Sequence, residues 1–185
     1  MRIRRFYELR QFLNALIITM EVEIAMKEQV FEFLKQEKIP YNVTEHEPVY
    51  TMEDMERVGL DKLGTLCKNL FIRDGKGKCY FLITASNDTA INLKELGEKL
   101  DAGKVSFASA ERLQQYLGVT AGCVSPFGVL NDAEHKVEVI LDQKLQGEKC
   151  LGVHPNEHDA TVWISFSDLQ KVLKKIGNSV KILKL

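Results

Sequence analysis

Apolar side chains between residues 21 and 38 recur at helical spacing. Met26, Val30 and Phe33 fall at i, i+4 and i+7, and charged residues fill most of the positions between them. This pattern predicts an amphipathic helix. Pro40 ends the helix, because proline lacks the backbone N–H that a continuing helix needs.

A short strand and a second helix are predicted next. Residues 41–46 (YNVTEH) have the composition of a short strand. Thr51, followed three positions later by Asp54, is a helix-start signal with an acidic first turn, and Gly64 is the latest point at which that helix ends.

The strongest pattern in the chain predicts a β-hairpin. Residues 67–74 (CKNLFIRD) and 79–85 (CYFLITA) are two β-rich runs on either side of a turn that contains Gly75 and Gly77. The second run is apolar throughout, which is typical of a strand that is buried on both faces.

The second half of the chain mixes helix starts with short apolar runs. Asn92 with Glu95, Ser109, and Ser167 with Gln170 are helix-start signals. Short strands and loops are predicted in between and at the end, in GCVSPFGVL, KVEVILD, KCLGVHP, ATVWISF and the closing VKIL. Hairpins are expected to dominate this half. We therefore predict an α+β fold, with a mixed, mainly antiparallel sheet and helices packed on it.

Charge separates the first twenty residues from the rest. The 185-residue chain has a net charge of −1, but residues 1–20 carry four Arg and one Glu, so the remainder carries 21 basic and 25 acidic side chains, or −4. The apolar run in this segment is short and lacks a small-residue cleavage site, which argues against a signal peptide. We interpret residues 1–20 as an appendage, or as the product of an upstream translation start, and residues 21–185 as one domain.

The four cysteines indicate a reducing, cytoplasmic environment. Cys67, Cys79, Cys123 and Cys150 form no C-x-x-C pair and have no histidine at zinc-finger spacing. No H-E-x-x-H motif is present either. The sequence therefore predicts neither a metal site nor any other cofactor, and no stretch is apolar for the ~20 residues of a membrane span.

Three segments contain candidate functional residues, each with an ordinary structural alternative. Lys68, at the start of the hairpin, is either a strand-end residue reaching solvent or a cation that holds an anion. The segment from Gly122 to Gly128 is either a tight turn or a loop that presents backbone N–H groups to a ligand. His154 is either a loop histidine bonded to backbone or a residue that shapes a substrate pocket.

Taken in order and spacing, these segments resemble one known family. KNLFIRD from Lys68, GCVSPFG from Gly122 and GVHPN from Gly152, followed by ATVWIS from Ala160, are similar to the YbaK-type aminoacyl-tRNA editing domains. Within that group the chain most resembles the free-standing prolyl-tRNA editing proteins, from about Glu21 to Leu185.

The resemblance implies roles for individual residues. Lys68 matches the family's signature lysine, implied to anchor the phosphate or ribose region of the terminal adenosine, and Gly122 lies in a loop whose backbone holds the substrate. His154 is implied to shape the amino-acid pocket. Further substrate-binding residues are implied at positions that flank these three: Asn69, Ser125, Pro126 and Asn156.

The resemblance also implies a reaction and partners. It predicts a hydrolase that cleaves the ester between a wrong amino acid, alanine in our interpretation and cysteine as its rival, and the acceptor end of proline tRNA. Prolyl-tRNA synthetase or an elongation factor are further expected partners, and DNA is not. Two other classes remain open: a non-catalytic tRNA-binding module, and a sensor or redox protein that uses Cys67 or Cys123.

Overall fold

The computed structural model describes residues 26–49 and 51–185, so the predicted N-terminal appendage lies outside the described residues. The first helix is described from residue 26 to residue 36. The other helices are α2 (Met52–Arg57), α3 (Leu93–Lys99), α4 (Ala110–Leu117) and α5 (Phe166–Ile176), with short 3-10 turns η1 (Leu60–Lys62), η2 (Pro126–Asn131) and η3 (Gln143–Leu145). None of the described helices combines the length and the hydrophobicity that a membrane-spanning segment needs.

The described strands form one eight-stranded sheet. The sheet is mixed, as the sequence predicted. Their bounds are β1 (Asn42–Glu45), β2 (Thr65–Asp74), β3 (Tyr80–Ser86), β4 (Val105–Phe107), β5 (Val137–Asp142), β6 (Leu151–Val153), β7 (Ala160–Ile164) and β8 (Val180–Leu183). Seven of them follow the order β1-β7-β6-β2-β3-β5-β8, and β4 pairs with β2.

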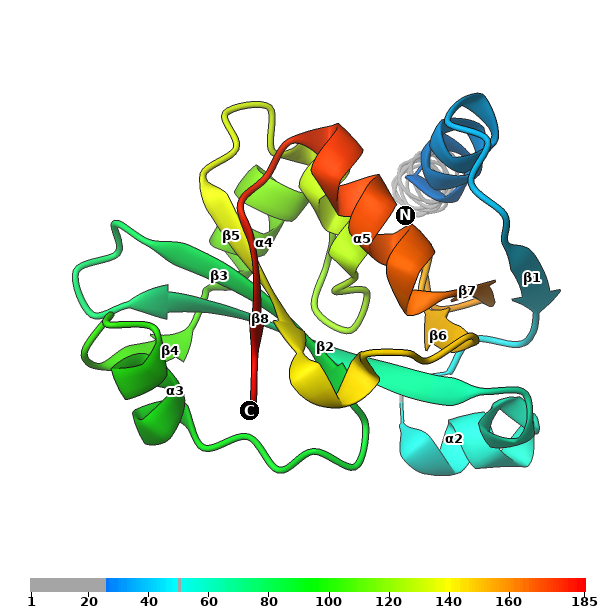
Figure 1. Cartoon of the computed structure of the whole chain (residues 1–185), viewed down its shortest axis with the longest axis horizontal. Coiled ribbons are helices and arrows are strands. Elements are labelled where there is room, and N and C mark those ends of the chain that lie inside the picture. The colour runs from blue at the N-terminus through cyan, green and yellow to red at the C-terminus, as the bar shows by residue number, and fades with distance from the viewer. Residues whose placement is uncertain (1–25, 50) are drawn as a thin grey trace, which may run out of the picture.

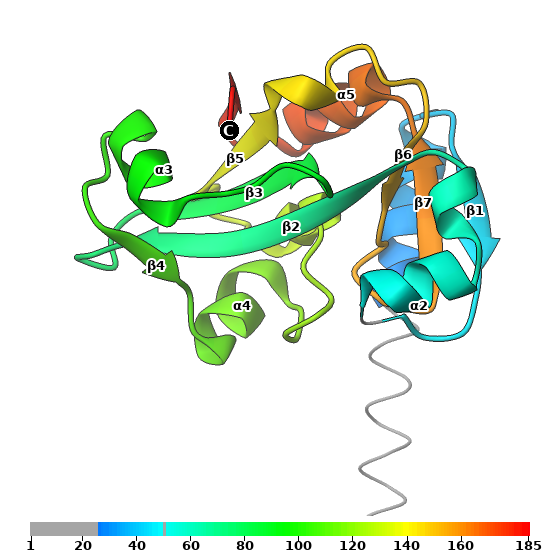
Figure 2. The same ribbon diagram turned by 90° about the horizontal axis from the view of Figure 1, so that it is seen from below.

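Strand β2 links the two halves of this sheet (Figure 2). Its first residues, Thr65 and Leu66, pair in parallel with β6, and its remaining length pairs antiparallel with β3 and then β4. The predicted hairpin is β2–β3, and every residue of β3 is buried, as its apolar run indicates. The expectation that hairpins dominate the second half was wrong, because β5 pairs in parallel with both β3 and β8.

Helices cover both faces of the sheet and enclose separate cores (Figures 1 and 2). The largest core includes Val30 and Leu34 of the first helix, Leu117 of α4 and Leu169 of α5. A second core lies under α3 and β4, and a third lies around Trp163 beside α2 and η1. Alternation along β2 therefore decides which core each of its side chains enters.

Local capping chemistry explains where most helices begin. Thr51 and Asp54 form the predicted reciprocal capping box of α2, and the Asn92 side chain accepts from the N–H groups of Lys94 and Glu95 at the start of α3. The predicted box at Ser167 was wrong. Helix α5 begins two residues earlier, because Ser165 accepts from Asp168 N and so serves as the N-cap.

Candidate active site

The Lys68 side chain extends from β2 and donates hydrogen bonds to two backbone carbonyl groups. It is half-buried, and its Nζ donates to the carbonyl oxygen of Asn87 at 2.9 Å and also to that of Thr89. It shares one face of β2 with Leu70 and Ile72, which contact the core under α3, as the period of two predicts. Lys68 is therefore held in place, and is not a freely moving strand-end lysine.

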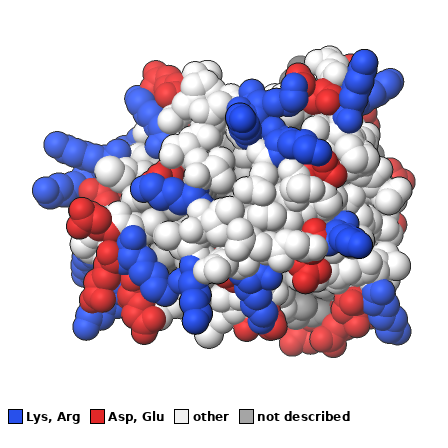
Figure 3. Space-filling model, in the orientation of Figure 1, with Lys and Arg blue, Asp and Glu red and all other residues white. Residues whose placement is uncertain are grey.

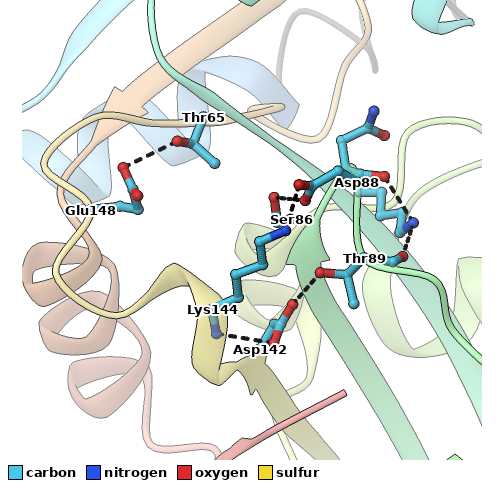
Figure 4. Close-up of polar contacts among 9 residues, drawn as sticks. Thr65, Ser86, Asp88, Thr89, Asp142, Lys144 and Glu148 are labelled. Carbon is cyan, nitrogen blue, oxygen red and sulfur yellow. Dashed lines mark hydrogen bonds and ion pairs between the residues drawn. The ribbon is translucent and has the colours of Figure 1, made fainter.

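Side-chain contacts fix the loop that supplies those two carbonyls (Figure 4). Thr89 Oγ1 donates to Asp142 Oδ2 at 2.6 Å, and Asp142 also accepts from Lys144 N at 3.1 Å. Ser86 donates a hydrogen bond to Asp88, and Asp88 also pairs with Lys144. Both contacts lower the pKa of Asp88, and the hydrogen bond from Lys144 has the larger effect.

A surface hollow of about 420 Å³ adjoins this network. It is lined by Thr89, Asp142, Gln143, Lys144, Lys184 and Leu185. The hollow therefore lies beside the residue whose carbonyl binds Lys68 and has two lysine side chains on its wall.

Asn69 lies on the opposite side of β2 from Lys68 and is bonded across the hairpin. The hydroxyl of buried Thr84 donates to Asn69 Oδ1 at 2.8 Å, and the two residues are direct partners in the β2–β3 register. This bond fixes the orientation of the Asn69 amide.

The loop from Gly122 to Pro126 is tied to the His154 segment through Ser125. Ser125 is fully buried, its Oγ donates to the carbonyl oxygen of His154, and it accepts from Phe127 N at 3.2 Å as the cap of η2. Gly122 has φ +98°, and a Cβ built there would meet no atom within 4 Å. Glycine is thus required by the left-handed backbone and not by crowding.

His154 and Asn156 place unpaired polar atoms in the interior. His154 is 9% exposed with no partner for Nδ1, and Asn156 is 1% exposed with no partner for either amide atom. Burial lowers the pKa of His154, so the ring is neutral near pH 7. Buried polar atoms without partners are costly, so they mark positions where a ligand can supply the missing hydrogen bonds.

The backbone around His154 has unusual local requirements. Gly152 lies so close to Trp163 that an added Cβ would come within 2.7 Å of its ring. Asn156 adopts φ +65°, a left-handed conformation that asparagine tolerates better than most residues. Both features give a reason for the residue types of the GVHPN segment.

Comparison with known families decides the identity of this arrangement. The family model for the aminoacyl-tRNA editing domain matches residues 46–172, which include all three candidate segments. The chain belongs to the aminoacyl-tRNA editing domain family.

Curated relatives of this editing domain agree with the assignment. The chain is 46% identical over 164 residues to the prolyl-tRNA editing protein ProX of Acetoanaerobium sticklandii, covering 89% of this chain and 100% of that protein. It is 32% identical to the prolyl-tRNA synthetase associated domain-containing protein 1 of Danio rerio, covering 86% of this chain and 88% of the relative.

Solved structures share the fold of this editing domain. The crystal structure of a candidate trans-editing enzyme for prolyl tRNA synthetase superposes with a TM-score of 0.67 at 20% identity, covering 86% of this chain and 97% of the other. The crystal structure of hypothetical protein APE2540 gives a TM-score of 0.63 at 19% identity, covering 82% and 95%.

The structure places one pair of the predicted site residues of the editing domain in direct contact. Ser125 and His154 are in direct contact, whereas the polar contacts of Lys68 run to Asn87 and Thr89. Sequence reasoning missed these two carbonyl partners, and no sequence signal could have found them, because every residue has a carbonyl group.

The cysteines of the editing domain differ in environment. Burial raises the pKa of Cys67 to about 12, so its thiol stays protonated at neutral pH, which argues against Cys67 as a redox centre. Cys123 Sγ lies 2.9 Å from His158 Nδ1, a contact that sequence reasoning also missed because the two residues are 35 positions apart.

Proposed function

We propose that this protein is an aminoacyl-tRNA deacylase that hydrolyses alanine mischarged onto proline tRNA. The observation that carries the proposal is the 46% identity to a prolyl-tRNA editing protein over that relative's whole length. The match between the family model and residues 46–172 supports the reaction class.

The reaction needs accurate placement more than a protein nucleophile. Water attacks the ester carbonyl, the bond to the ribose oxygen breaks, and the free amino acid and the tRNA hydroxyl leave. An activated ester requires a positioned water and stabilisation of the developing oxyanion. Backbone N–H groups of the Gly122 loop other than that of Cys123, which donates to Thr120 O, supply the donors, and the neighbouring ribose hydroxyl assists the water.

Lys68 anchors the terminal nucleotide in this proposal. A lysine ammonium has three N–H donors, and two of those of Lys68 are committed to the Asn87 and Thr89 carbonyls. The third is left for a phosphate or ribose oxygen, and the carbonyls keep the side chain from swinging away. The fixed ammonium thus acts as a reference point for the ester.

His154 and Asn156 form part of the amino-acid pocket in this proposal. Their unpaired buried atoms, His154 Nδ1 and the Asn156 amide, support it, because a bound aminoacyl group can pair with them. Ser125 and Pro126 hold the loop that faces this pocket, and Asn69 keeps β2 in register beside Lys68. A small pocket rejects proline by size, but it separates alanine from cysteine by only ~1–3 kcal/mol.

The proposal is tested by measuring the rate at which Lys68→Ala deacylates mischarged proline tRNA. Lys76→Ala is the matched control, because Lys76 is an exposed lysine on the hairpin turn. Loss of one anchoring charge in the site is expected to lower kcat/KM by about 100-fold, and the control is expected to match the wild type. Equal rates for Lys68→Ala and the wild type would refute the anchoring role.

Substrate choice is tested by offering alanine-charged and cysteine-charged proline tRNA to the wild type. Faster release of alanine is expected. Faster release of cysteine would reassign the substrate, and tRNA binding with no cleavage of either ester would leave a binding module.

A further inference from the structure

Three metal-ligating side chains converge beside the Gly122 loop. The ligand atoms of Cys123, Glu157 and His158 all lie within 4.8 Å of one another, and Cys123 Sγ is 2.9 Å from His158 Nδ1. Cys123 and Glu157 are buried and His158 is half-buried. No role in the proposed deacylation is assigned to any of the three.

The backbone holds these three residues in place from two separate loops. Cys123 N donates to Thr120 O at 3.2 Å, which closes the turn that contains Gly122. On the other loop, the His158 carbonyl accepts from Val49 N at 2.9 Å, and Asp159 O accepts from His46 N at 3.0 Å. The ligand atoms are therefore brought together by fixed backbone and not by flexible side chains alone.

The chemistry of the three groups favours zinc over a hard cation. A thiolate, an imidazole and one carboxylate are all zinc ligands, whereas magnesium and calcium prefer oxygen alone. With Zn–S near 2.3 Å and Zn–N near 2.0 Å, a tetrahedral ion requires about 3.5 Å between sulfur and nitrogen. The distance between Cys123 Sγ and His158 Nδ1 is 2.9 Å, so these two atoms need to move apart by roughly half an ångström to hold the ion.

We propose that Cys123, Glu157 and His158 form a zinc site that fastens the Gly122–Pro126 loop to the 154–159 loop. The ion replaces the thiol proton, so binding releases a proton and leaves a fourth coordination position open. The site acts alongside the Ser125–His154 contact, which already joins the same two loops. Zinc therefore sets the rigidity of the loops around the candidate active site.

Cobalt substitution tests this site directly. The full-length protein is stripped of metal with a chelator and titrated with Co²⁺, whose thiolate charge-transfer absorption reports a sulfur ligand, and Zn²⁺ affinity is then measured by competition. The wild type is expected to bind one equivalent with the thiolate band. Cys123→Ser is expected to lose the band, and His158→Gln to weaken zinc binding at least about tenfold, or about 1.4 kcal/mol.

Cys79→Ser is the matched control, because Cys79 is a free and exposed thiol away from the cluster. It is expected to keep both the band and the affinity. Zinc is also expected to raise the melting temperature of the wild type and of Cys79→Ser, and to raise that of His158→Gln by less at the same zinc concentration. This readout remains available where Cys123→Ser does not fold. Absence of a thiolate band in the wild type, or its loss in Cys79→Ser, would overturn the proposal, and neither result depends on deacylation.

Discussion

Burial lowers the pKa of His154, the residue whose carbonyl oxygen accepts from Ser125 Oγ of the Gly122–Pro126 loop. Desolvation is the largest cause of its lowered pKa, and the nearby His46 and His158 act in the same direction, while hydrogen bonds with the Ala160 and Glu157 backbone oppose it. The folded protein therefore binds fewer protons at this site than the unfolded chain does at mildly acidic pH.

The free energy of unfolding should therefore depend on pH through His154. Because the folded pKa is lowered, the contribution of the neutral ring is fully present above the unfolded value near 6.5 and is lost as the pH falls toward the folded pKa. We expect His154→Gln to lose less stability than the wild type between pH 7 and pH 5 in urea unfolding.

His135→Gln is the control for that measurement, because His135 contacts Asn178 and lies outside the candidate site. It is expected to keep the wild-type pH dependence. If the stability of His154→Gln had the same pH dependence as that of the wild type, burial would not lower the pKa of His154.

At the scale of elements, side-chain caps decide where helices start, as α5 shows. Ser165 Oγ accepts from Asp168 N at 3.0 Å and donates to Asp168 Oδ2 at 2.6 Å, while Lys171 bonds to the other carboxylate oxygen. Ser167 is exposed, and its hydroxyl contacts that of Ser165. The wrong sequence prediction chose Ser167 because a serine with Gln170 three positions later satisfies the same local pattern.

Alanine substitution at the two serines should separate these alternatives. Ser165→Ala is expected to lower the free energy of unfolding by about 1 kcal/mol, because it removes the acceptor for Asp168 N at the helix start. Ser167→Ala is expected to change it by less than about 0.5 kcal/mol, as for most exposed substitutions. Chemical denaturation of both variants measures the difference, and equal effects would contradict the assigned cap.

At the scale of the whole molecule, positive charge is dispersed among acidic side chains, and part of it is paired with them. Figure 3 shows Lys and Arg side chains around the edge of one face, interspersed with Asp and Glu, and an uncharged central area. Lys171 and Lys175 of α5 pair with Asp168 and Glu37, and Lys144 pairs with Asp88. With a net charge of −4 over residues 21–185, attraction to RNA has to come from a few positioned cations.

The affinity for tRNA should therefore depend only weakly on salt. Each phosphate contact to a single strand contributes about −0.7 to the slope of log Kobs against log salt concentration. We expect a slope no steeper than about −3, corresponding to about four contacts or fewer, measured by fluorescence titration over a range of salt concentrations. A slope near that of proteins with ten phosphate contacts would contradict a site built on a few cations.

Agreement between sequence and structure was best where the signal is local. The β2–β3 hairpin, the caps at Thr51 and Asn92, and the shared face of Lys68 and Leu70 on β2 were all predicted, because each depends on residues within one turn or one strand pair. The family resemblance was also readable, since the spacing of three short segments carries it.

The sequence by itself thus determined the elements, the mixed sheet and the family of this protein. Only the tertiary structure decided that β5 lies between β3 and β8, that Lys68 is held by the Asn87 and Thr89 carbonyls, and that Cys123 meets His158. The physical reason is range: caps, turns and periodicity act over a few residues, whereas parallel pairing and contacts between loops depend on packing across the whole core.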